Sequence, residues 1–200
     1  HSSPRRQRQM CIRDRNRQPF FGQIQLRGGK NNTENINKEI KVDPNNVAVP
    51  ADYPNNKIFK EIVAQHYEAI RVDDNIIGKI IQQLKDTGLY KNTIVVYFSD
   101  HGANNLLRHK QMLTEGGLHV PFVVMGPSKY VPNGKVRNDL VNMLDLSATT
   151  LSWAGVDVPN WYEGKSLFSK NFTPRSFVAA HKDRLDHTID RVRTVRTENY

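Results

Sequence analysis

One apolar run, Thr93–Phe98, constrains the fold of this 200-residue chain more than any other feature. The run reads TIVVYF and lacks the polar alternation of a strand that has one face in water. It predicts a strand buried on both faces, as in a parallel sheet covered by helices. A second run of this kind, Val120–Gly126, predicts a second strand.

A long amphipathic segment, Ile58–Lys85, predicts a helix that could cover such a sheet. Its apolar residues recur at steps of three and four, which places them on one face. Gly88 is expected to form part of the C-terminal cap. His66, Asp73 and Asp74 lie on or near this helix, and we expect capping, surface or core-edge roles for them rather than metal binding.

The remaining elements complete an α/β order. The pattern predicts strands at Pro19–Leu26 (buried) and Ser176–His181, and a helix over Asn138–Gly155. It predicts a long surface excursion at 27–57 and an irregular connection at Val158–Phe168. No apolar run reaches the ~18 residues of a membrane span. No signal peptide is visible at the start, His1–Met10.

The formal charge of +9 is concentrated in residues 1–30, which hold eight Arg or Lys residues and one acid. Without interleaved aromatic residues, this segment does not predict a nucleic-acid partner. A basic polyanion-binding module remains an alternative, and deleting residues 1–18 would then abolish polyanion binding. The stretch Met10–Arg15, MCIRDR, reads like a translated transposon-end adapter from DNA library preparation. Residues 1–18 are therefore expected to be non-native or disordered, unless the underlying codons differ from the adapter; the alternative is an ordinary basic tail.

Chemistry-bearing residues follow the first apolar run. Asp100 and His101 stand at the expected carboxyl end of a strand, where ligands bind in open α/β sheets. A carboxylate oxygen and an imidazole nitrogen there could hold a divalent cation, with Gly102 making room for the turn. The alternative is a turn-forming aspartate. His109 and Lys110 follow in a loop that would suit an anion, although a lone lysine is more often simply solvated.

The whole stretch LKDTGLYKNTIVVYFSDHGANNLLRHKQMLTEGGLHVPFVVMGP resembles the second half of the sulfatase catalytic domain, within the alkaline-phosphatase-like superfamily. VNMLDLSATTLSWAGVDVP and the C-terminal HKDRLDHTIDRVRTVRTENY extend the resemblance, which runs from about Pro19 to Tyr200. It implies a partial α/β/α sandwich with a mostly parallel central sheet, truncated at both ends. Residues 19–168 would be a partial catalytic domain and residues 169–200 the start of a C-terminal subdomain.

The resemblance also implies a calcium-dependent sulfuric ester hydrolase. Asp100 and His101 match the second pair of ligands to one Ca²⁺, Lys110 matches a lysine that contacts sulfate oxygens, and His109 lies beside it. Glu115–Gly117 match a structural loop outside the site. In the family, a Cys or Ser is converted to formylglycine, whose hydrate attacks sulfur. The implied substrate is a sulfated small molecule or glycan, and the implied location is periplasmic or extracellular.

Parts of the family pattern are missing. The first pair of metal-binding aspartates is absent. Ser2, in SSPRR, fits the Cys/Ser-x-Pro-x-Arg string of the formylglycine precursor but lacks the usual continuation, and Cys11 lacks the required proline. Arg27–Lys30 replaces a frequent Pro-His pair, which would alter the substrate pocket. We therefore expect a fragment that binds calcium weakly, is inactive and exposes an apolar sheet edge. A zinc phosphodiesterase or phosphoethanolamine transferase of the same superfamily is the alternative, but Asn104–Leu107 follow the DHG turn where those enzymes carry further His and Asp ligands.

Overall fold

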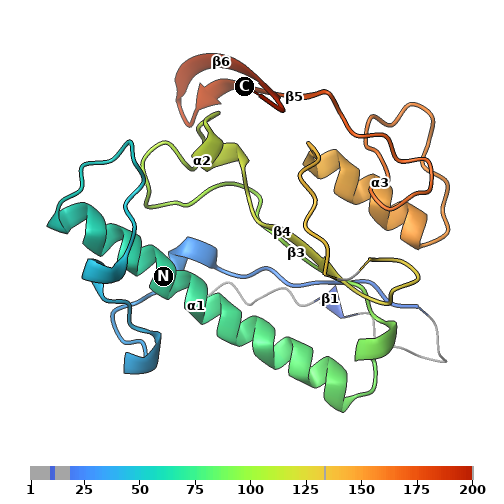
Figure 1. The fold of residues 1–200 in the computed structure, drawn as a ribbon, viewed down its shortest axis with the longest axis horizontal. Helices are drawn as coiled ribbons and strands as arrows, with labels where there is room; N and C mark the ends of the chain where they lie inside the picture. The colour runs from blue at the N-terminus through green and yellow to red at the C-terminus, as the bar shows by residue number, and fades with distance from the viewer. Residues whose placement is uncertain (1–9, 12–18, 133, 200) are drawn as a thin grey trace. The chain divides into compact units, whose positions relative to one another are not determined.

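The computed structural model describes residues 10–11, 19–132 and 134–199. Figure 1 shows the described chain as a ribbon. The chain divides into two compact units. Unit 1 comprises residues up to Ile80 together with Ala103–Leu106, and unit 2 comprises Ile81–Gly102 and the residues from Leu107 onward. Apart from Met10 and Cys11, the predictions for residues 1–18 lie outside the described residues.

The predicted long helix is confirmed as α1, Lys57–Asp86. The Asn56 side chain accepts the Phe59 N–H at 3.1 Å and so satisfies a donor of the first turn. At the other end Gly88 has φ +73°, and the Leu89 N–H donates to the Leu84 carbonyl at 2.9 Å. The 6→1 bond and left-handed glycine are those of a Schellman cap, so the expected role of Gly88 is confirmed.

The core of unit 1 lies where α1 meets the preceding irregular segment. Val63 and Ala64 of the helix pack with Val47, and Val42 and Leu106 border this cluster. Three short 3-10 helices, Gly28–Lys30 (η1), Lys38–Ile40 (η2) and Pro44–Asn46 (η3), interrupt the irregular segment. The segment predicted as a surface excursion therefore contributes Val47 to the core.

Two buried carboxylates on α1 hold this segment. Asp73 accepts the Gly28 N–H at 2.8 Å and the Asn31 amide at 2.7 Å. Glu68 accepts the Val42 N–H at 3.1 Å. Because buried polar groups are costly unless hydrogen-bonded, these contacts define a structural role for both acids. The expectation that Asp73 is structural is confirmed.

Unit 2 contains the predicted strand after the helix. β3, Val95–Phe98, follows the short 3-10 helix Tyr90–Asn92 (η4) and pairs antiparallel with β4, Phe122–Met125. β5, Phe177–Leu185, and β6, Thr188–Thr197, form a long antiparallel hairpin. The strand predicted at Ser176–His181 thus extends four residues further, because β6 pairs with it along its length.

The sheet predictions need correction. Every described pair is antiparallel, in three two-stranded sheets, so a mostly parallel central sheet is not confirmed. β3 has one strand partner and is half-buried, with Phe98 40% exposed, rather than buried on both faces. Within the predicted buried strand Pro19–Leu26, only Gly22–Gln23 (β2) forms a strand, paired with Met10–Cys11 (β1), and Phe21 is 56% exposed. Phe21 and Phe98 are therefore exposed apolar residues in these two segments.

The last predicted helix begins later than expected. α3 spans Met143–Trp153, because Asn142 makes a capping box with Asp145 and so begins the helix. Residues 138–142 are not helical, and Leu140 forms an isolated bridge with Arg175. Gly155, at φ +71°, ends α3 with a second Schellman pattern, in which the Val156 N–H donates to the Leu151 carbonyl.

Candidate functional site

All four predicted site residues lie in unit 2, in the turn after β3 and in the loop before the short helix α2, Glu115–Leu118. The turn is braced from both ends. The Ser99 N–H donates to the Pro121 carbonyl at 3.3 Å, and the Ser99 hydroxyl donates to the His101 carbonyl at 2.7 Å. These bonds leave the Asp100 side chain pointing into solvent, where it is 80% exposed.

The orientation of the His101 ring is determined by a backbone contact. Nδ1 lies 2.7 Å from the Gly102 carbonyl oxygen. A carbonyl oxygen can only accept, so Nδ1 carries the proton and Nε2 of the neutral ring presents a lone pair. Nε2 lies 3.7 Å from Asp100 Oδ1. Two ligand atoms at about 2.4 Å from one cation and about 100° apart are separated by about 3.7 Å, so the pair has the spacing of two neighbouring metal ligands.

The pair alone is not a complete metal site. A calcium ion takes about six to eight oxygen-rich ligands. The part of the chain that the structure describes contains no group of three or more His, Cys, Asp or Glu side chains placed to hold a metal ion. Asp100 and His101 therefore fit two positions around a cation and leave the others unassigned.

Three glycines join the turn to the loop that follows. The Gly102 N–H donates to the Gly117 carbonyl at 3.2 Å. A Cβ on Gly102 would overlap the Gly116 carbonyl oxygen, and one on Gly117 would overlap the carbonyl oxygens of Met112 and His109. Gly102 has no left-handed φ, so this close approach explains the glycine rather than the conformational freedom expected for a tight turn.

The loop around Lys110 has an unusual backbone. Arg108 and Gln111, on either side of His109 and Lys110, have φ of 58° and 64°. The Met112 N–H donates to the His109 carbonyl at 3.1 Å and closes a turn with Lys110 and Gln111 at its centre. The Lys110 side chain is half-buried, and its ammonium makes no hydrogen bond or ion pair with any described residue. This placement leaves a positive charge available to an anion.

His109 is a structural neighbour of the glycines. Its Nδ1 lies 2.7 Å from the Leu107 carbonyl oxygen. Its ring lies against Gly116, where an added Cβ would be 2.8 Å from Cε1. Gly116 and Gly117 therefore contact both the turn with Asp100 and His101 and the loop with Lys110. The sequence analysis placed these two glycines in a structural loop outside the site. The sequence feature that could have indicated their positioning role is the pair of consecutive glycines shortly before the β4 segment.

A substitution at Gly102 tests this contact. Gly102→Ala is expected to lower the free energy of unfolding by about 1–3 kcal/mol, because the added methyl group overlaps backbone atoms that cannot move aside freely. Urea unfolding of the purified chain measures the difference. Gly78→Ala on α1 is the control: nothing lies within 4 Å of its Cβ, and a helical glycine replaced by alanine should stabilise the chain. A Gly102→Ala chain as stable as the wild type would contradict the close packing.

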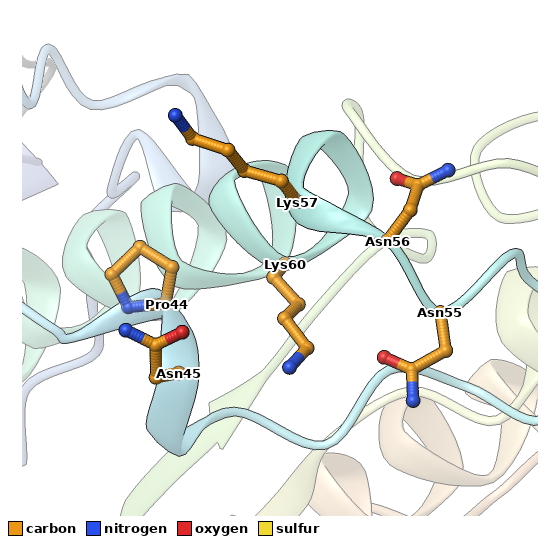
Figure 2. A pocket seen from close by; sticks show the side chains of 6 residues that line it. All are labelled: Pro44, Asn45, Asn55, Asn56, Lys57 and Lys60. Atoms are coloured by element: carbon orange, nitrogen blue, oxygen red, sulfur yellow. The ribbon is translucent and has the colours of Figure 1, made fainter.

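A pocket in unit 1 is separate from these residues. It has a volume of about 290 Å³ and is lined by Pro44, Asn45, Asn55, Asn56, Lys57 and Lys60. Figure 2 shows Lys60 extending between Asn45 and Asn55, whereas Lys57 points away. The pocket has no carboxylate or imidazole in its lining, so it supplies none of the predicted metal ligands.

Comparison with known proteins identifies the family. The sequence model of the family described as Sulfatase matches residues 9–156. An ulvan-active sulfatase of Formosa agariphila is 30% identical over 154 residues, covering 76% of this chain and 25% of that protein. Arylsulfatase K of Xenopus laevis is 35% identical over 127 residues (58% and 23%), and arylsulfatase K of Homo sapiens is 32% identical over 130 residues (63% and 23%). The chain spans about a quarter of the length of these relatives. The chain belongs to the sulfatase family.

Proposed function

We propose that this chain supplies the metal- and sulfate-binding half of a calcium-dependent sulfatase site that hydrolyses sulfuric esters. One observation carries the proposal: Asp100 and His101 have the spacing of two metal ligands, and the same pair of glycines contacts both their turn and the loop of Lys110. Membership of the sulfatase family and the names of the relatives support the reaction class.

Calcium is the cation proposed for the turn after β3. The Asp100 carboxylate would provide an oxygen ligand and His101 Nε2 a nitrogen ligand, with the remaining ligands coming from other residues. A bound divalent cation would withdraw charge from the sulfate oxygens during reaction. Two sets of hydrogen bonds in this chain would orient the metal ligands. The Nδ1–H bond to the Gly102 carbonyl directs His101 Nε2 toward the cation position, and the Ser99 bonds hold the turn that carries Asp100 and His101.

Lys110 is proposed to bind the sulfate group itself. A fixed ammonium can hydrogen-bond a non-bridging oxygen of the ester and stabilise the charge that develops on it. Its half-buried position excludes part of the water that would otherwise screen it. His109 is a second, less direct contact, because its ring packs on Gly116 in the same loop. The nucleophile proposed from the family is formylglycine, and the sequence does not locate its precursor.

The substrate and location proposed here follow the relatives. One relative is named an ulvan-active sulfatase, and another, from Drosophila melanogaster, an extracellular sulfatase. We propose a sulfated glycan or sulfated small molecule as substrate, and a periplasmic or extracellular location. We also propose that residues 19–168 form part of a catalytic domain and that the β5–β6 hairpin, within residues 169–200, begins a C-terminal subdomain.

Within the described residues, no helix is both long and apolar enough to cross a membrane.

The purified 200-residue chain is expected to bind calcium weakly, with a Kd of about 10⁻³ M or higher, because Asp100 and His101 supply only two ligands. It should also show no turnover of an aryl sulfate. Titration calorimetry with Ca²⁺, and with Zn²⁺ in parallel, measures the binding. Asp100→Ala should remove it, and Asp74→Ala, at an exposed position on α1, should leave it unchanged. Calcium binding that survives Asp100→Ala would contradict the metal site, and robust turnover would contradict the expected inactivity.

A further inference from the structure

The β5–β6 hairpin contacts the segment that directly follows Lys110. Gln111 Nε2 donates to Asp186 Oδ1 at 3.1 Å. Lys182 Nζ lies 3.8 Å from Met112 Sδ, and Arg196 Nε lies 3.7 Å from Glu115 Oε2. Figure 1 shows the hairpin beside α2, which begins at Glu115. The three contacts involve both strands and the tip of the hairpin.

The contact at the tip joins two residues with left-handed backbones. Gln111 has φ 64° and Asp186 has φ 50°. Asp186 is the first residue of the two-residue turn between Leu185 and Thr188, a position where glycine is the least strained choice when φ is positive. Aspartate tolerates this conformation and adds a carboxylate, which glycine lacks. The Asp186 carboxylate accepts a hydrogen bond from the side chain of Gln111. Gln111 directly follows Lys110 and also has a left-handed backbone.

The hairpin is itself braced, so its tip is a defined point of attachment. Lys182 is 10% exposed and pairs with Asp190 at 2.5 Å. Arg193 pairs with Asp183 at 2.6 Å, and the strands stay in register along most of their length. A flexible tip could not position the loop, whereas a paired hairpin can.

We propose that Asp186 is a positioning residue that fixes the turn carrying Lys110, so that the C-terminal hairpin sets the position of the sulfate-binding ammonium. The turn from His109 to Met112 has Lys110 and Gln111 at its centre, so fixing Gln111 also fixes the direction in which Lys110 leaves the backbone. The role of the turn in sulfate binding rests on the proposed function of Lys110. The mechanical link between hairpin and turn does not.

Hydrogen exchange in the 200-residue chain tests that link without enzymatic activity. The reporter is the Met112 amide, which closes the turn by donating to the His109 carbonyl. Asp186→Gly keeps the positive φ but removes the acceptor, and it should raise the Met112 exchange rate about tenfold, the loss expected for one charge-assisted hydrogen bond. Asp186→Asn keeps an acceptor oxygen and the tolerance for positive φ, and should stay within about twofold of the wild type.

Asp157→Gly is the matched control, since Asp157 is an exposed aspartate in the loop after α3, in the same unit but outside the hairpin. It should leave Met112 exchange unchanged. The link is overturned if Asp186→Gly leaves Met112 unchanged, or if it raises exchange equally in α3, which would indicate general loosening of unit 2.

The catalytic consequence is measured in an active sulfatase that contains this chain. Asp186→Gly should raise KM for an aryl sulfate about three- to tenfold through displacement of Lys110, and Asp186→Asn should restore it. A merely structural defect would lower the amount of active enzyme, and so kcat, with KM unchanged. Unchanged KM overturns the positioning role. If Lys110→Ala itself leaves catalysis intact, the proposed function fails instead, and the exchange result still decides the link between hairpin and turn.

Discussion

Replacing Asp145 with alanine is expected to lower the free energy of unfolding by about 3–5 kcal/mol, because it leaves the Arg175 charge without its counter-ion and two backbone donors without an acceptor. The Asp145 side chain is 1% exposed and lies 2.5 Å from Arg175 Nη2. It also accepts the Asn142 N–H at 2.9 Å and the Lys165 N–H at 2.7 Å. The same carboxylate thus caps α3 and ties it to two later segments.

Urea unfolding measures the loss, and Asp183→Ala is its control. Asp183 pairs with Arg193 at 2.6 Å, but both side chains are more than half exposed. Exposed ion pairs contribute about 0–1 kcal/mol, so this variant should be close to the wild type. Equal effects of the two substitutions would contradict the special position of Asp145.

The pH dependence of stability provides a second measurement on Asp145. Burial raises the pKa of its carboxyl group, but the hydrogen bonds from Arg175, Asn142 and Lys165 outweigh it, and the pKa is lowered from the ordinary 3.8. The unfolded chain therefore binds this proton more readily than the folded chain. The stabilisation is fully present above pH 3.8 and is lost as pH falls through the lower folded pKa. The difference in stability between wild type and Asp145→Asn should shrink on acidification below that value; a constant difference would contradict the shift.

Lys110→Ala is expected to lower kcat/KM about 10²- to 10³-fold in an active sulfatase that contains this chain. The physical reason is the loss of a fixed positive charge beside the sulfate oxygens. The thermal midpoint should not fall, because the ammonium has no hydrogen-bond or ion-pair partner in the described part of the chain. Steady-state kinetics with an aryl sulfate and a thermal melt on the same preparation measure both quantities.

Lys129→Ala is the matched control for lost positive charge. Lys129 is exposed and lies 4.5 Å above the Tyr130 ring, in the loop that follows β4. Its removal should change kcat/KM less than about twofold, since exposed charges are screened. Lys110→Ala activity within threefold of the wild type would refute sulfate binding by this lysine.

Features with a local physical cause were predictable from the sequence. The apolar spacing of Ile58–Lys85 predicts α1 to within one residue at each end, because one face of a helix repeats every three to four residues. Gly88 ends it, because a left-handed C′ residue favours glycine. The run Thr93–Phe98 contains β3. Burial was predicted less well, because it depends on which segments cover a strand. The sequence of one segment does not specify which other segments pack against it.

The sequence by itself determined the family, the main helix and the four candidate site residues, since motif strings and periodicity lie within short windows. Only the tertiary structure decided how those residues are held. The glycine contact joins Gly102 to Gly116 and Gly117, and the buried ion pair joins Asp145 to Arg175. The hydrogen bond between Gln111 and Asp186 spans 75 residues. Such contacts depend on how separate segments pack, and packing follows from shape and hydrogen bonding in three dimensions rather than from any local pattern.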